Sequence, residues 1–221
     1  MKLLLNIALV IHIATGFLAL VTGFISMLNT KGGKRHRLTG KLFFIGITGV
    51  FVSATIIAVA KGLAFLLMVG FFSYYLACSG YRSLYLKKLH LKQKPALLDW
   101  LISLVGVVAG AALVWFSMYW FRDRGAWGLV PLLFGLFCGI SGIGDLKRFF
   151  VPPTNKLHWI TTHGGRMGGS FAATLTAFIV VNVQIGALSW ILWILPGLLV
   201  GVWITRLLRR YKVKAVVPES A

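Results

Sequence analysis

Long apolar runs dominate this sequence and limit the folds open to it. Each run is long enough to cross about 30 Å of hydrocarbon as an α-helix, which rises about 1.5 Å per residue. The runs cover residues 4–27, 42–60, 63–86, 97–120, 126–145, 159–183 and 187–208. With 58% hydrophobic and 12% charged residues, the chain carries more apolar surface than a soluble core of ordinary size can bury. The sequence therefore predicts an all-α, polytopic membrane protein with seven transmembrane helices in one domain, residues 1–212, and a short cytoplasmic tail, residues 213–221.

Basic residues are distributed unevenly among the segments that join these runs. Eighteen of the 23 Lys and Arg residues follow the first, third, fifth or seventh run, and only four lie on the opposite side. Lys and Arg in short loops are retained in the cytoplasm, so the amino terminus is expected outside and the carboxyl terminus inside. The net charge of +19 then reflects topology and contact with anionic membrane lipids, and no nucleic acid is expected as a partner. Attraction of an anionic substrate to the cytoplasmic face is the alternative reading.

The sixth run carries two ionisable residues, His163 and Arg166, inside an otherwise apolar helix. At about 100° per residue, His163 shares one line with small or polar residues such as Ser170 and Thr174, and Arg166 lies beside it. A charge that faces lipid costs about 2.5–3.5 kcal/mol on insertion scales, so this face is expected to look into protein or water. It is the first part of the candidate site.

Polar residues on three other runs complete the candidate site. His12 lies on a stripe of small residues in the first run, Asp99 begins a similar stripe in the fourth, and Asp145 ends the fifth. Such stripes let membrane helices approach closely, so His12 and Asp99 are expected to face inward. Because an unpaired arginine is costly in a membrane, we expect Arg166 to form an ion pair with Asp99 or Asp145. That ion pair could also be purely structural.

The two halves of the chain show weak internal similarity. In each half an apolar run is followed by a basic loop with a histidine and then by a second run that begins with small residues. The two segments are GFISMLNTKGGKRHRLTGKLFFIG and GIGDLKRFFVPPTNKLHWITTHGG. The pattern predicts a 3+1+3 arrangement, in which the first three and last three helices are parallel repeats about an axis along the membrane normal. Such a repeat would bring His36 towards His158 or His163.

A resemblance to a known family rests on four segments taken together. These are KGGKRHRLTG after the first run, FFSYYLACSGYRSL in the third, DLKRFFVPP after the fifth and HGGRMGGSFAATLTAFIVVN in the sixth. Their order resembles a family of predicted bacterial seven-helix membrane proteins that is catalogued as a domain of unknown function. The resemblance implies a multi-pass protein of the bacterial inner membrane and draws attention to His12, His36, Arg37, His163 and Arg166. It implies no activity and no cofactor.

Three classes of function remain open. The preferred one is binding or transport of a small solute or ion along the polar faces of the first, fourth and sixth helices. The second is a haem- or metal-binding redox protein, for which His36 with His163 or His158 is the only histidine pairing that depth in the membrane allows. The third is a structural or assembly protein whose polar contacts are internal. Cys78 and Cys138 give neither a disulfide framework nor a zinc signature, and an enzymatic role is left undecided.

Overall fold

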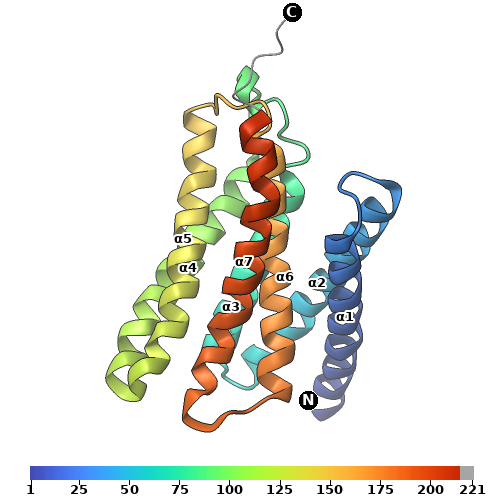
Figure 1. The fold of residues 1–221 in the computed structure, drawn as a ribbon. Coiled ribbons are helices and arrows are strands. Elements are labelled where there is room, and N and C mark those ends of the chain that lie inside the picture. Colours follow the sequence, from blue (N-terminus) through green and yellow to red (C-terminus); the bar gives the residue numbers. More distant parts are fainter. Residues whose placement is uncertain (215–221) are drawn as a thin grey trace, which may run out of the picture.

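The computed structural model describes residues 1–214, with side chains as far as Arg209, and over that range it is all helical (Figure 1). The long helices are α1 (Lys2–Leu28), α2 (Lys34–Ala60), α3 (Ala64–Arg82), α4 (Leu97–Arg124), α5 (Leu129–Phe150), α6 (His158–Asn182) and α7 (Ser189–Lys214). Three short 3-10 turns join them: η1 (Leu89–Leu91), η2 (Gly125–Gly128) and η3 (Gly186–Leu188). The predicted all-α class is confirmed. Residues 215–221 of the predicted tail lie outside the described residues.

Within the described residues, five segments are long and apolar enough to cross a membrane. They are Lys2–Leu28, Lys34–Ala60, Ala64–Arg82, Leu97–Phe150 and Gly186–Arg209, the fourth of which contains both α4 and α5. α6 is not among them, because its first half is rich in glycine and carries His163 and Arg166. Large apolar side chains such as Phe17, Trp115 and Val181 are exposed, which suits a lipid environment. The chain is therefore an integral membrane protein.

The helices form three antiparallel hairpins around α3. α1 packs on α2, α4 on α5 and α6 on α7, while α3 contacts α2, α4, α5 and α6. Figure 1 shows α7 ending at the same end of the bundle as the α1–α2, α3–α4 and α5–α6 connections, with the amino terminus at the other end. We call the end of the bundle that holds these three connections and the end of α7 the basic end, because the four groups of basic residues described above lie there. The predicted repeat would need α5 to pack on α6 as α1 packs on α2, and the structure does not confirm it.

Glycines allow the backbones of paired helices to touch. A Cβ atom added to Gly135 of α5 would lie 2.7 Å from the backbone nitrogen of Val114 in α4. A Cβ added to Gly46 of α2 would lie 2.9 Å from the backbone nitrogen of Ala19 in α1. Small residues are the usual means of close approach between membrane helices, where lipid offers little hydrophobic driving force for association. The small-residue stripes predicted on the first and fourth runs therefore lie at the α1–α2 and α4–α5 interfaces.

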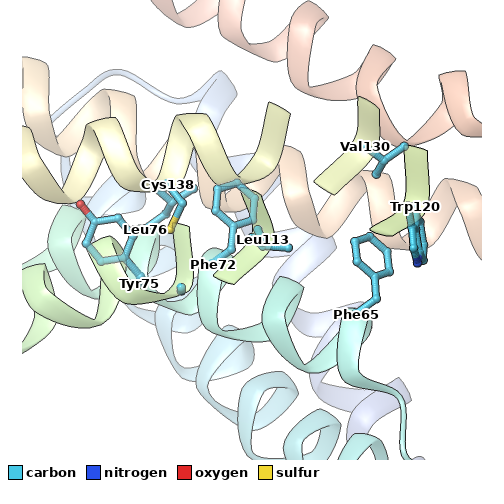
Figure 2. Close-up of a cluster of buried hydrophobic side chains, with 9 residues drawn as sticks. Phe65, Phe72, Tyr75, Leu76, Leu113, Trp120, Val130 and Cys138 are labelled. Carbon is cyan, nitrogen blue, oxygen red and sulfur yellow. The ribbon is translucent and has the colours of Figure 1, made fainter. Parts of the chain in front are cut away.

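A cluster of apolar side chains fills the space between α3, α4 and α5 (Figure 2). Its buried members are Phe65, Phe72, Tyr75, Leu76, Ala109, Leu113, Trp120, Val130 and Cys138. The Cys138 thiol packs as a small residue and donates to the carbonyl oxygen of Gly106 at 3.1 Å. Tyr75 lies at one end of the row, and its hydroxyl points away from the other labelled side chains. The cluster thus holds a polar group at the boundary of the candidate site.

Replacing Gly135 by leucine is expected to destabilise the α4–α5 hairpin, because even its Cβ would lie 2.7 Å from the Val114 nitrogen. Forcing extra volume into a packed interface typically costs about 1–3 kcal/mol. The midpoint of thermal unfolding, measured on the detergent-purified protein, should therefore fall below that of the wild type. Gly197→Leu in α7 is the control, since a Cβ there meets nothing within 4 Å. Equal midpoints for the two variants would contradict the close approach of α4 and α5.

Candidate functional site

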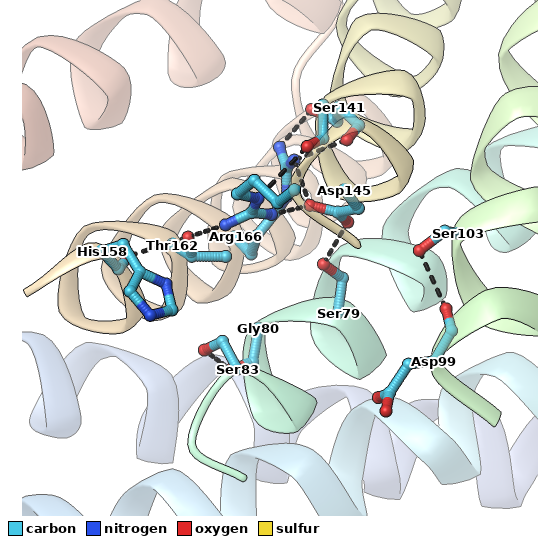
Figure 3. Close-up of polar contacts among 12 residues, drawn as sticks. Ser79, Gly80, Ser83, Asp99, Ser103, Ser141, Asp145, His158, Thr162 and Arg166 are labelled. Carbon is cyan, nitrogen blue, oxygen red and sulfur yellow. Dashed lines mark hydrogen bonds and ion pairs between the residues drawn. The ribbon is translucent and has the colours of Figure 1, made fainter. Parts of the chain in front are cut away.

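A single buried carboxylate, that of Asp145, connects α3, α5 and α6 near the basic end (Figure 3). The side chain is only 4% exposed. Its Oδ2 accepts hydrogen bonds from the hydroxyls of Tyr75 and Ser79 in α3, each at 2.6 Å. Its Oδ1 accepts from the guanidinium of Arg166 in α6 at 3.0 Å and from that of Arg148, which follows on α5. Four donors thus compensate for the loss of water around this carboxylate, as a buried charge requires.

The two arginines bring more positive charge to this centre than Asp145 neutralises. Arg166 also donates to the hydroxyl of Ser141 and, at 2.7 Å, to its carbonyl oxygen. Arg148 donates to the Thr162 hydroxyl and, at 3.2 Å, to the carbonyl oxygen of Gly144. These extra bonds are to neutral groups, and the buried Nε of Arg166 has no hydrogen-bond partner. Two guanidiniums against one carboxylate leave the centre with a formal charge of +1.

Asp99, the other carboxylate predicted to lie near this level, has a different partner. Its oxygens accept from the guanidinium of Arg82 at 2.7 and 3.1 Å, and one accepts from the backbone N–H of Ala96 at 2.8 Å. This pair connects the end of α3 to the first turn of α4 and is balanced in charge. Of the two ion pairs that the sequence allows for Arg166, the structure contains the one with Asp145.

An open cleft lies beside the two arginines, between α5, α6 and α7, with a volume of about 410 Å³. Its walls are formed by Gly144, Arg148, Thr161, Thr162, Gly165, Arg166, Thr205 and Leu208. A Cβ added to Gly144 or Gly165 would meet nothing within 4 Å. These two glycines therefore leave space in the cleft and do not serve helix packing. None of the described residues that line the cleft is acidic.

A second, smaller cavity of about 20 Å³ lies on the other side of Arg148. We call it the inner chamber. Asp145, Asp99 and His158 are among its lining residues, and Arg148 and Thr162 line both it and the cleft. A cavity of this volume has room for a water molecule. The bonded Arg148–Thr162 pair is therefore part of the wall that separates the open cleft from the buried side of the carboxylate.

The histidines form two pairs near the basic end and one separate contact. Nδ1 of His163 lies 2.9 Å from the carbonyl oxygen of Gly80, and its ring meets that of His36 edge-on at a centroid distance of 6.3 Å. The rings of His90 and His158 lie 5.9 Å apart. His12 is bonded to Ser53 of α2 at 3.2 Å, in the other half of α1. The structure therefore groups Arg166 with Asp145, places Asp99 across the inner chamber, and leaves His12 outside the group.

His36 and His163 are the pair that the sequence suggests for haem. Nδ1 of His36 lies 3.0 Å from the carbonyl oxygen of Ser26, so each ring has its Nδ1 beside a backbone carbonyl. That arrangement would leave both Nε2 atoms for a ligand. The rings meet edge-on, however, and neither histidine lines the cleft or the inner chamber. Among the described residues, no three or more His, Cys, Asp or Glu gather as metal ligands would.

Several residues of the centre are absent from the sequence-based site. By sequence Arg148 is one of the basic residues that follow the fifth apolar run, and Tyr75, Ser79 and Thr205 carry no signal of their own. The spacing of Asp145 and Arg148 could have revealed their contact, because residues three apart lie on one helix face. The remaining members come from α3 and α7, and only the tertiary packing brings those helices to Asp145.

No protein-family model, curated protein or solved structure matches this chain. The resemblance to a bacterial seven-helix family therefore stays a prediction. The chemistry open to the site follows from its own geometry and charge.

Replacing Asp145 by asparagine is expected to cost about 3–5 kcal/mol, because it leaves two partly buried guanidiniums without a counter-charge. Asp123→Asn is the control: Asp123 and Arg124 form a pair whose side chains are 54% and 56% exposed, and an exposed pair contributes little. Thermal unfolding in detergent should separate the two variants clearly. Adding Arg166→Gln to Asp145→Asn should recover part of the loss, and a strictly additive loss would contradict the shared centre.

Proposed function

We propose that this protein binds a small anionic solute in the cleft between α5, α6 and α7. The observation that carries the proposal is the composition of the cleft walls, with two guanidiniums and three threonine hydroxyls and, among the described lining residues, no acid. A centre with a net positive charge in a partly buried setting attracts anions far more strongly than a solvated lysine or arginine does. The cleft volume of about 410 Å³ lies within the range of sites for small ligands.

The chemistry of the walls suits an oxyanion, that is, a carboxylate, phosphate or sulfate group. Arginine presents N–H groups in a planar fork that matches two oxygens of such a group. Arg148 and Arg166 reach the cleft from α5 and α6, and the hydroxyl of Thr205 adds a neutral donor from α7. The hydroxyls of Thr161 and Thr162 make the cleft wall polar but donate to the carbonyl oxygen of His158. The empty space beside Gly144 and Gly165 lets a ligand approach the helix backbones closely.

This site differs from the path along the first, fourth and sixth helices that the sequence suggests. α3 packs between α4 and α6, so the polar face of α4 meets α3 and α5, and Asp99 is bonded to Arg82. α1 packs on α2 and α6. The proposed binding site therefore involves α5, α6 and α7. Transport of the bound solute is the further step that a flux measurement would address.

We propose that the chain spans the bacterial inner membrane seven times, with the amino terminus outside and the basic end in the cytoplasm. The uneven distribution of Lys and Arg supports this orientation, and the seven helices alternate in direction accordingly. The cleft then opens at the level of the inner leaflet, where lipid phosphates are also present. A free solute and a lipid headgroup would be bound by the same chemistry, so the test must separate the two sources.

Sulfate is a suitable probe, because it presents oxyanion chemistry without titrating near neutral pH. We expect sulfate to raise the unfolding midpoint of the protein in neutral detergent, compared with chloride at equal ionic strength, since a ligand of the folded state stabilises it. Gly165→Leu, which fills the cleft, and Arg148→Gln should each weaken the effect at least tenfold. Gly197→Leu, outside the cleft, should leave it unchanged.

The source of the anion is tested on the same proteins with vesicles of neutral lipid and of neutral lipid containing one-fifth anionic phospholipid. A stabilisation by anionic lipid that Gly165→Leu abolishes would assign the cleft to headgroups, and stabilisation by sulfate alone would assign it to a free solute. If sulfate and anionic lipid both leave the wild-type midpoint unchanged, the proposal is wrong, and the polar centre is a structural contact.

Topology is tested with single cysteines in a Cys78→Ala, Cys138→Ala background. Arg124→Cys in the predicted outer connection should react with a membrane-impermeant maleimide in intact bacterial cells. Lys34→Cys at the basic end should react only after the membrane is permeabilised. Both side chains lie at exposed positions, so a lack of reaction reports the side of the membrane and not burial. The reverse pattern would overturn the proposed orientation.

A further inference from the structure

We infer that a doubly charged anion in the cleft is bound together with one proton, which Asp145 takes up, whereas a singly charged anion is bound without one. The inference rests on the proposed anion site and names how that site is regulated. It follows from the formal charges of the centre and from the position of Arg148 between the cleft and the inner chamber.

The formal charges of the centre determine how many protons accompany the anion. Arg148, Arg166 and the Asp145 carboxylate have a formal charge of +1 together. A singly charged anion in the cleft neutralises them. A doubly charged anion leaves an excess of –1 beside an aspartate side chain that is 4% exposed, and an uncompensated buried charge is costly. One proton removes that excess, and Asp145 is the acid that lies against both arginines.

A bound anion and the Asp145 carboxylate compete for the same two guanidiniums. Arg148 and Arg166 both donate to Oδ1 of Asp145, and both line the cleft. An anion that draws their N–H groups towards the cleft weakens their bonds to Oδ1. The protonated carboxyl keeps acceptors for the hydroxyls of Tyr75 and Ser79, which donate to Oδ2. The proton is therefore bound on the Oδ1 side, where the guanidiniums have withdrawn.

The inner chamber gives the proton a route to that carboxylate. Asp145 and His158 both line it, and Nε2 of His158 is buried without a hydrogen-bond partner. A water in the chamber can bond this nitrogen and the polar groups around Asp145. The ring of His90, which is half-buried in η1 at the basic end, lies 5.9 Å from that of His158. The chamber beside His158 therefore offers the proton a route to the carboxyl group, and His90 lies next to His158 at the basic end.

Other charged or titratable groups face Asp145 from the helices packed around it. α3 contributes Tyr75 beside it and Arg82 across the chamber, and α4 contributes Asp99, which is paired with Arg82. α5 contributes Arg148, and α6 contributes Arg166 and His158. The described α7 residues that line the cleft are Thr205 and Leu208, neither of which titrates. Only Asp145 and His158 can change protonation at this centre without breaking an otherwise balanced pair.

The test compares sulfate with methyl sulfate, which differ by one charge and do not titrate between pH 5.5 and 7.5. In the wild type, linkage of one proton should tighten sulfate binding by up to about tenfold per unit fall in pH. Methyl sulfate affinity should stay constant over the same range. Calorimetric titration in two buffers of different ionisation enthalpy, at the same pH, should show one proton taken up per sulfate and none per methyl sulfate.

Two variants assign the proton. Asp145→Asn should make sulfate binding independent of pH, and His158→Gln should slow proton uptake in stopped-flow measurements while the equilibrium pH dependence stays. Loss of the pH dependence in His158→Gln with Asp145 intact would overturn the assignment to Asp145. Equal pH dependence for the two anions in the wild type would overturn the coupling itself. Failure of both anions to bind at any pH would instead overturn the proposed function.

Discussion

The shared carboxylate of Asp145 is the interaction on which the basic end of this bundle depends. A membrane interior offers no water to solvate a charge, so each polar group that enters it must find its partner within the protein. Asp145 meets that requirement for α3, α5 and α6 at once, with two hydroxyl donors and two guanidiniums. In sequence order α3 is separated from α5 and α6 by α4. The carboxylate therefore fixes their relative positions in a way that apolar packing alone would leave adjustable.

Glycine serves two opposite purposes in the same helices. Gly135 brings α5 against the backbone of α4, and Gly168 lies against the Ile204 side chain of α7. Gly144 and Gly165, only a few residues away from them in sequence, face open space at the cleft. The sequence alone does not distinguish the two kinds, because each is a glycine within a long helix of small and apolar residues. Their difference appears only when the neighbouring helix is placed, and it separates a packing interface from a binding surface.

The parts of the fold that periodicity and local charge determine could be predicted from the sequence. Spacing predicts the all-helical class and the inward faces of α1 and α4. The cost of an unpaired charge predicts that Arg166 pairs with Asp99 or Asp145, and the structure contains the pair with Asp145. The central place of α3 and the role of Arg148 could not be predicted. Both depend on contacts between residues far apart in the chain, and Arg148 resembles any other member of a basic loop until α6 and α7 are packed beside it.

Arg148 shows why a basic cluster should not be assigned to topology alone. Its place in the last turn of α5 agrees with the proposed retention of positive charge on the cytoplasmic side, and a lysine or arginine anywhere in the following connection would serve that purpose equally. Its bonds to Asp145 and Thr162 are specific to one position on one helix face. A topological signal needs only charge, whereas a half-buried guanidinium facing a cleft also needs donors, acceptors and space arranged around it. The second set of requirements is met here, so Arg148 supports the proposed binding site as well as the proposed orientation.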